Sequence, residues 1–194
     1  MGVLTYTDEH TSSVSPARTF KASIVDSHNL MPKLLPDATK SINIVKGDGG
    51  AGSIKENSHN LMPKLLPEAI KSISFIKGDG GAGSIKEIKF AGRKVIFNPI
   101  YFVKHHINEL NEKTLTYKYT LIEGEGISDK IEKVSYDIKF EGSPDGGTIS
   151  KMTTTIYTHG DFELKEKLKA GKEEVLGLYK VVEVYLLKNP DAYI

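Results

Sequence analysis

The chain has 194 residues, which is enough for one domain with a sizeable core, or for one domain that carries an insertion. Its formal net charge of +1 gives no reason to expect binding to nucleic acid or to an anionic membrane surface. The absence of cysteine excludes disulfides and thiolate metal sites. No run approaches the roughly 18 apolar residues of a membrane span, and the N-terminal residues lack a signal-peptide core. We therefore expect a cytoplasmic protein without metal or cofactor.

The N-terminal segment predicts a strand followed by a short helix. Apolar and polar residues alternate from Val3 to Ser13, which is typical of a strand. Ser15 and Pro16 then match a helix start, with serine as the N-cap and proline at the first helical position. We expect this helix to run to about Val25.

A segment of 31 residues occurs twice in succession. Residues 26–56 recur as residues 57–87 with six differences. Each copy begins with two prolines four residues apart, which predict one or two turns of helix broken at each proline. A strand and a glycine-rich loop follow in both copies.

One sheet has a single place for the strand, loop and strand that each copy encodes. We therefore expect a single domain over residues 1–194 in which one copy, 26–56 or 57–87, is an insertion. The second copy is favoured for the sheet because it continues directly into the next strand. The first copy stays an alternative because it continues from the N-terminal helix. A spare hairpin has unpaired edges, so we also expect a homodimer through the repeated segment.

The glycine loops match the dinucleotide-binding pattern G-x-G-x-x-G. Their glycines are Gly78, Gly80, Gly81 and Gly83, with the duplicates Gly47, Gly49, Gly50 and Gly52. In a dinucleotide site the loop must lead into a helix, whose N-terminus holds the pyrophosphate. Here the second loop leads into residues 84–90, whose alternation predicts a strand. We therefore interpret the loop as a hairpin turn.

The remainder of the chain predicts a run of strands and then one long helix. Strands are expected at 94–97, 101–110, 114–123, 131–141 and 148–158, with short turns that favour an antiparallel meander. After Gly160, apolar residues recur every three or four positions, which predicts an amphipathic helix of about 25 residues ending at Asn189. A curved sheet around one helix leaves a cavity, on the order of 300 to 1,000 Å³ for a small-molecule site.

Several motifs together resemble the plant pathogenesis-related class 10 proteins, the family of the major birch-pollen allergen. They include the glycine loop followed by Ser-Ile-Lys, and four further stretches at 117–124, 129–133, 144–147 and 158–161. The C-terminal stretch Glu183 to Leu187 and the ending at 191–193 also match. The similarity covers the whole chain except one repeat copy and a few residues near 93–99.

The resemblance implies an α+β helix-grip fold, in which a curved seven-stranded antiparallel sheet, two short helices and a long C-terminal helix surround a hydrophobic cavity. It further implies binding of amphipathic plant molecules such as cytokinins, flavonoids, steroids or fatty acids, in defence or hormone physiology. A ribonuclease activity attributed to the family would fall on Lys86 (or its twin Lys55), Glu132, Glu183 and Tyr185. Norcoclaurine synthase, of the same superfamily, suggests a condensing enzyme as another alternative.

The residues themselves favour binding over catalysis. Cleavage of RNA commonly uses a positioned acid and base, often histidines, and the six histidines show no paired spacing. Adjacent His105 and His106 would point to opposite faces of a strand. Inward-facing aromatic and apolar residues are better candidates for contact with a small-molecule ligand. These candidates are Phe102, Tyr117, Tyr119, Tyr136, Leu178, Val182 and Tyr185.

Overall fold

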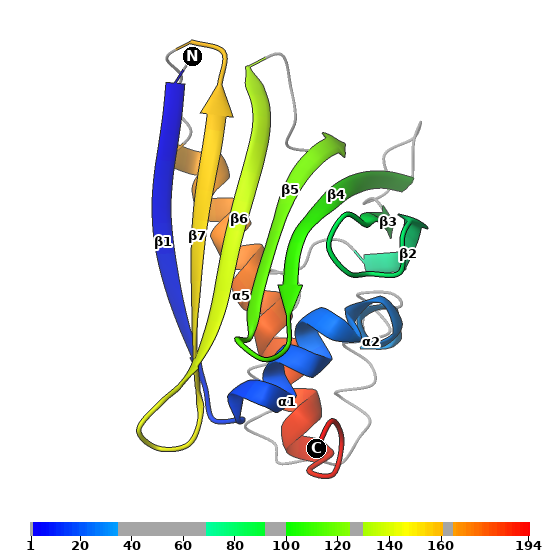
Figure 1. The fold of residues 1–194 in the computed structure, drawn as a ribbon, viewed down its shortest axis with the longest axis vertical. Coiled ribbons are helices and arrows are strands. Elements are labelled where there is room, and N and C mark those ends of the chain that lie inside the picture. The colour runs from blue at the N-terminus through cyan, green and yellow to red at the C-terminus, as the bar shows by residue number, and fades with distance from the viewer. Residues whose placement is uncertain (1, 35–68, 92–99, 125–129, 161–164) are drawn as a thin grey trace.

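The computed structural model describes residues 2–34, 69–91, 100–124, 130–160 and 165–194. Seven strands form one antiparallel sheet, with helices packed against it (Figure 1). The strands are β1 (Gly2–Ser12), β2 (Ala69–Lys77), β3 (Ile85–Ala91), β4 (Ile100–Asn111), β5 (Thr116–Gly124), β6 (Ile131–Gly142) and β7 (Thr148–Thr158). The helices are α1 (Pro16–Phe20), the π-helix η1 (Lys21–Val25), α2 (Ser27–Leu34) and α5 (Lys165–Lys188). This is the predicted α+β helix-grip fold.

The sheet confirms the predicted meander. Its order is β1-β7-β6-β5-β4-β3-β2, so every strand from β2 to β7 pairs with its neighbour in the chain, and β1 closes the order beside β7. Along β7 the residues alternate strictly between buried and half-buried, as expected for a strand with one face toward the core. The predicted strand at 94–97 lies outside the described residues.

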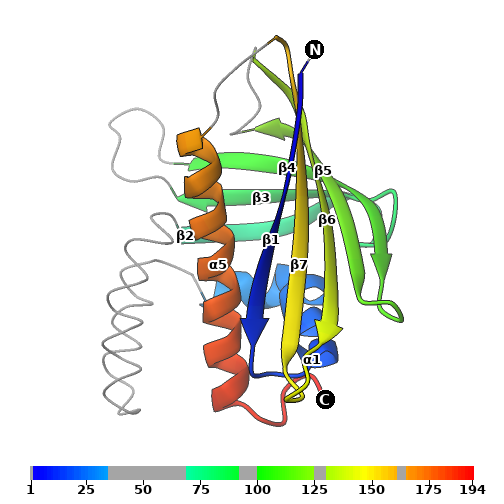
Figure 2. The same cartoon turned by 90° about the vertical axis from the view of Figure 1, so that its left-hand side faces the viewer.

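The C-terminal helix α5 runs along one face of the curved sheet, with α1 and α2 near one end of the sheet (Figure 2). Two sets of hydrogen bonds fix it there. Arg18 of α1 donates hydrogen bonds to the carbonyl oxygens of Leu186, Asn189 and Ala192, at 3.2, 3.0 and 2.9 Å respectively. At the end of β1, Glu183 accepts from the Ser12 hydroxyl and the Ser13 amide, both at 3.0 Å.

The short helices differ from expectation at two residues. Ser15 precedes α1, but its side chain makes no capping hydrogen bond; its carbonyl instead accepts from the amide and hydroxyl of Thr19. The expected break at Pro32 was wrong, because α2 continues through it to Leu34. Proline removes a single backbone donor, and the burial of Leu30 and Met31 in the core offsets that loss.

The two repeat copies contribute different elements to the described structure. Helix α2 belongs to residues 26–56, whereas β2, the glycine loop and β3 come from the second copy and its continuation. The described sheet therefore uses the strand, loop and strand of 57–87, and the helical corner uses the start of 26–56. Residues 35–68, including Gly47, Gly49, Gly50, Gly52 and Lys55, lie outside the described residues.

The second glycine loop is the predicted hairpin turn. It joins β2 to β3, which pair antiparallel, and no helix follows it. Gly78, Gly80 and Gly83 have φ angles of +79°, +106° and +83°, which side chains other than glycine adopt at a cost. The buried Ser84 hydroxyl accepts a 3.0 Å bond from the Gly80 amide and so closes the loop. The loop is therefore a structural turn between two paired strands.

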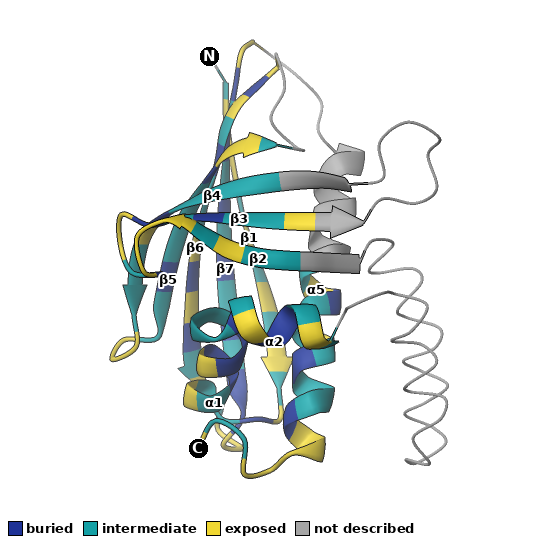
Figure 3. Cartoon of the chain, turned by 90° about the vertical axis from the view of Figure 1, so that its right-hand side faces the viewer, coloured by how far each residue is buried: buried dark blue, intermediate teal, exposed yellow. Residues whose placement is uncertain are grey.

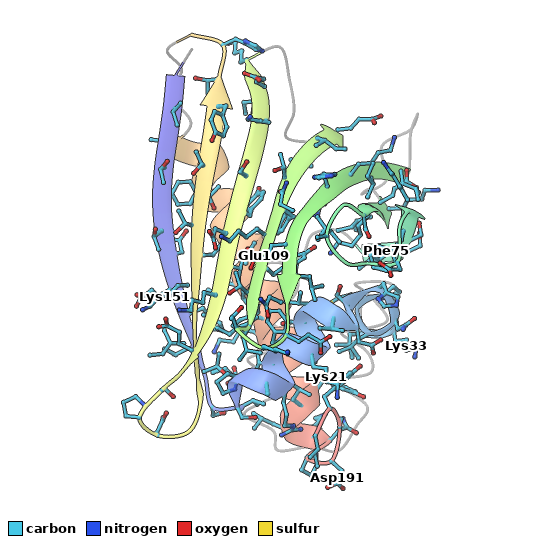
Figure 4. All side chains as sticks on the ribbon, viewed as in Figure 1. Lys21, Lys33, Phe75, Glu109, Lys151 and Asp191 are labelled. Atoms are coloured by element: carbon cyan, nitrogen blue, oxygen red, sulfur yellow. The ribbon has the colours of Figure 1, made fainter. Side chains whose placement is uncertain are left out.

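Replacement of Gly80 by alanine should destabilise this turn. A Cβ atom at Gly80 would lie 2.9 Å from the Phe75 ring (labelled in Figure 4), in addition to the strain of a positive φ. We expect a loss of about 2–3 kcal/mol in the free energy of unfolding, measured by urea titration.

Gly146→Ala is the matched control for Gly80→Ala. Gly146 also has a positive φ, +85°, but a Cβ atom there would meet nothing within 4 Å. It should cost only about 1 kcal/mol. Equal losses at both positions would show that the Phe75 contact contributes nothing.

Candidate ligand-binding cavity

A cavity of about 120 Å³ lies between the sheet, α2 and α5. The burial colouring in Figure 3 shows buried positions on α2 and α5 and at intervals along the strands. The cavity is smaller than the expected 300 to 1,000 Å³, and three tyrosines and one lysine are among its lining residues. Its described lining residues are Ser23, Ile24, Ser27, Met31, Ile73, Lys86, Ile88, His105, Tyr117, Tyr119, Ile138, Met152, Val175, Leu178 and Tyr179.

Two basic side chains face each other in this lining. Lys86 of β3 pairs directly with His105 of β4 across the antiparallel ladder, so both point to the same face of the sheet. Lys86 is only 7% exposed. Burial, and then the positive charge of Lys86, lower the pKa of His105 to about 3. His105 is therefore a neutral imidazole at physiological pH.

A ladder of aromatic rings continues from His105. Tyr119 stacks on His105 at 4.5 Å between centroids, and Tyr136 stacks on the same tyrosine at 4.6 Å. Tyr117 lies 5.1 Å from Tyr119 and beneath the ammonium group of Lys86, at 5.2 Å. Burial raises the pKa of Tyr119 well above its ordinary value, so its hydroxyl stays protonated. These rings give the cavity a flat, polarisable wall.

Two buried polar atoms at the cavity have no hydrogen-bond partner among the described residues. They are Nδ1 of His105 and the hydroxyl oxygen of Tyr117. A buried polar group without a partner costs about 1–3 kcal/mol. A ligand that supplies hydrogen-bonding groups at this point would remove that cost.

A second hollow, of about 140 Å³, lies on the other side of Tyr179 between β1 and α5. It shares Met152, Val175 and Tyr179 with the first cavity. The Tyr179 ring is held between His10, at 5.5 Å, and Phe140, at 5.8 Å. Tyr179 therefore forms part of the partition between the two spaces.

A family model described as the Pathogenesis-related protein Bet v 1 family matches residues 54–189. The chain belongs to this family. The match contains β2, the glycine loop, β3 and all later elements that line the cavity, up to α5.

Relatives and solved structures agree over nearly the full length. The chain is 43% identical to Major allergen Pru ar 1 of Prunus armeniaca and 41% identical to Major strawberry allergen Fra a 1.07 of Fragaria ananassa, over 100% of this chain and 99% of each relative. The crystal structure of Ara h 8.0201 superposes with a TM-score of 0.71 at 31% identity, covering 97% of this chain and 100% of that one. Norcoclaurine synthase from Thalictrum flavum shares the fold, with a TM-score of 0.59 at 15% identity, covering 96% of this chain and 87% of that one.

The predicted ligand contacts fall into three groups. Tyr117, Tyr119 and Leu178 line the cavity, and Tyr136 packs behind Tyr119. Val182, which is 0% exposed, and Tyr185 belong instead to an apolar cluster with Val14 and Leu186. The Phe102 side chain lies outside the described residues.

The residues proposed for ribonuclease activity occupy different surroundings. Lys86 lines the cavity, Tyr185 packs in the apolar cluster, and Glu132 is exposed on β6. Glu183 is bound to the end of β1 and to Lys180, at 3.2 Å. Burial of Glu183 opposes ionisation, but the Ser13 amide, the Ser12 hydroxyl and Lys180 lower its pKa overall. No contact among the described residues joins these four side chains.

Sequence reasoning missed His105 and Tyr179 as cavity residues, and it did not place Lys86 in the cavity. The alternation of residues along a strand could have identified two of these residues, Lys86 and His105. Lys86 shares a strand face with Ile88, and His105 shares one with the buried Ile107, so alternation placed both inside. In the described part of the chain no three metal-ligating side chains gather, and none of the helices there combines the length and hydrophobicity that a membrane crossing requires.

His105 should make the protein less stable as pH falls. Its pKa is 6.5 when unfolded and about 3 when folded, so the unfolded state binds more protons between these values. The contribution of His105 to the free energy of unfolding is fully present above pH 6.5 and is lost as the pH falls toward 3. Between pH 6.5 and 5 the free energy of unfolding should fall by about 2 kcal/mol through His105.

Urea titrations of His105→Phe at the two pH values test this. The variant should lose that part of the pH dependence, while His159→Phe, at an exposed position, should keep it. An unchanged slope in His105→Phe would contradict the buried, neutral histidine.

Proposed function

We propose that the protein binds amphipathic small plant molecules in the cavity beneath α5, as a carrier or storage protein in defence or hormone physiology. The observation that carries the proposal is an apolar cavity that contains two buried polar atoms, of His105 and Tyr117, for which the described part of the chain supplies no hydrogen-bond partner. Such a site combines apolar area for affinity with a few polar groups for orientation. Membership of the Bet v 1 family supports the same role.

The size of the cavity ranks the candidate ligands. A cavity of about 150 Å³ holds one benzene molecule, so a cavity of about 120 Å³ holds no more than a single aromatic ring unless its lining moves. Compounds with one aromatic ring are therefore favoured over cytokinins, whose purine has two fused rings, and over flavonoids, steroids and long fatty acids. The larger molecules would bind only if Tyr179 moved, because its movement would connect the cavity to the adjoining hollow.

Displacement of N-phenyl-1-naphthylamine, a neutral fluorescent apolar probe, tests the proposal. The cytokinin 6-benzylaminopurine should displace it at micromolar concentration. Failure of the probe and the cytokinin to bind, together with degradation of RNA by repurified protein that a Glu132→Gln variant loses, would favour the enzyme instead.

Catalysis is the second candidate function. A condensing enzyme is suggested by the fold shared with norcoclaurine synthase and by the buried amine of Lys86. Turnover of an amine and an aldehyde by the wild type, abolished in Lys86→Met, would support it. Ribonuclease activity has weaker support, since the exposed Glu132 lies apart from the cavity residue Lys86.

We propose a cytoplasmic location and self-association through the repeated segment. Strand β2 lies at one of the two edges of the described sheet, and Ile76 on it is 52% exposed, which suits pairing with the copy of this strand that residues 26–56 of a second chain encode. Deletion of residues 26–56 should leave a monomer in light scattering, whereas the full chain should form dimers. Equal oligomeric states in both proteins would contradict this.

A further inference from the structure

The ammonium group of Lys86 has no anionic partner among the described residues, and Lys86 lines the cavity. The side chain is 7% exposed, and its nearest characterised contact is the Tyr117 ring, at 5.2 Å. No carboxylate among the described residues forms an ion pair with it. A buried charge is costly unless it is paired and hydrogen-bonded, so this amine has an unmet requirement for an anion.

The remaining lining residues do not meet this requirement. The described lining contains no aspartate or glutamate. His105, opposite Lys86, is neutral, and the Tyr119 hydroxyl stays protonated. Lys86 is therefore the one charged side chain among the described residues that line this cavity, and it favours an anionic group there.

A second hydrogen-bond donor lies beside Lys86. The buried hydroxyl of Tyr117 has no partner among the described residues, and it can donate a hydrogen bond. The Lys86 ammonium lies over the ring of Tyr117, and the hydroxyl belongs to the same ring. A carboxylate has two oxygens, so it can accept from both donors at once.

The aromatic ladder indicates that an anionic ligand of this cavity should carry an aromatic ring. Tyr117, Tyr119 and the His105 ring form one wall of a space that suits a single aromatic ring. From this geometry we infer that the cavity prefers an aromatic carboxylic acid with a short linker, its ring against the tyrosine wall and its carboxylate on Lys86 and Tyr117. The inference rests on the proposed binding function and names the ligand class of that site.

Three ligands of nearly equal shape test the inference by calorimetry. They are 3-phenylpropanoate, 3-phenylpropan-1-ol and 3-phenylpropan-1-amine, which is a cation at neutral pH. Wild-type protein should bind the acid about ten- to a hundred-fold more tightly than the alcohol, the range for a hydrogen bond to a charged group. The amine should bind most weakly, because it meets a like charge.

Lys86→Met removes the charge while it keeps the length of the side chain. The acid should lose its advantage over the alcohol, and the alcohol should bind at least as well as before. Lys21→Met, at an exposed lysine on η1 (labelled in Figure 4), is the control and should leave all three affinities unchanged.

Two outcomes would overturn the inference. One is a wild-type protein that binds the alcohol as tightly as the acid, a comparison that needs no variant. The other is a folded Lys86→Met that keeps the preference for the acid. Failure of all three ligands and of the neutral fluorescent probe would instead overturn the binding function itself.

Discussion

Replacement of Tyr179 by alanine should join the two hollows and strengthen the binding of ligands with more than one ring, which the wild type binds only at a cost. Tyr179 lines both spaces, and its ring is held between His10 and Phe140. A two-ring ligand in the wild type must displace this ring or strain the core, at a cost of about 1–3 kcal/mol. N-phenyl-1-naphthylamine should therefore bind Tyr179→Ala about tenfold more tightly than wild type.

The same replacement should lower stability by about 3–5 kcal/mol, since a large aromatic side chain is removed from a packed site. Tyr157→Ala is the matched control. Tyr157 lies on the opposite face of the sheet, 4.4 Å beneath the Lys133 ammonium, and its loss should leave probe affinity unchanged. Unaltered affinity in Tyr179→Ala, with the variant folded, would show that Tyr179 does not divide the space.

Replacement of Phe20 by alanine should cost about 3–5 kcal/mol in the free energy of unfolding. Phe20 is 1% exposed and packs edge-on against Phe140 at 5.5 Å, so it anchors α1 to the sheet beside the cavity. Val3→Ala provides the contrast, because Val3 is 61% exposed and its loss should change stability by less than about 0.5 kcal/mol. Urea unfolding of both variants measures the difference.

A loss below about 1 kcal/mol in Phe20→Ala would contradict the role of Phe20 as the anchor. It would mean that α1 is held mainly by other contacts, such as the hydrogen bonds from Arg18 to the end of α5. The double variant with Arg18→Met would then separate the two contributions.

The sheet and the long helix could be predicted from sequence because their periodicity is strong. Apolar and polar residues alternate in 148–158 because one face of this strand is buried, and the structure has β7 there. Apolar residues recur every three or four positions before Asn189 because one face of the helix is buried, and the structure has α5 there. The glycine pattern could be assigned to a hairpin because a strand, β3, follows it. The passage of α2 through Pro32 could not be predicted, because tertiary burial of Leu30 and Met31 overrides the local preference.

The candidate site was predicted less completely than the fold. Tyr117 and Tyr119 could be placed in the cavity because aromatic residues on an inward face were expected there. Tyr185 and Val182 have the same apolar character but pack in the cluster with Val14, and spacing along a helix does not separate cavity wall from core. Lys86 is named from the sequence only in the ribonuclease set and not as a cavity residue, although its side chain is buried.

The most direct test of ligand binding is to map where a ligand binds by NMR. Isotope-labelled protein is titrated with 3-phenylpropan-1-ol, which carries no charge and so does not depend on Lys86. Binding in the cavity predicts saturable shifts for His105, Leu178 and Ile138, while the exposed His159 stays unchanged. Shifts confined to the outer face of the sheet, or no shift at millimolar ligand, would contradict the cavity as the binding site.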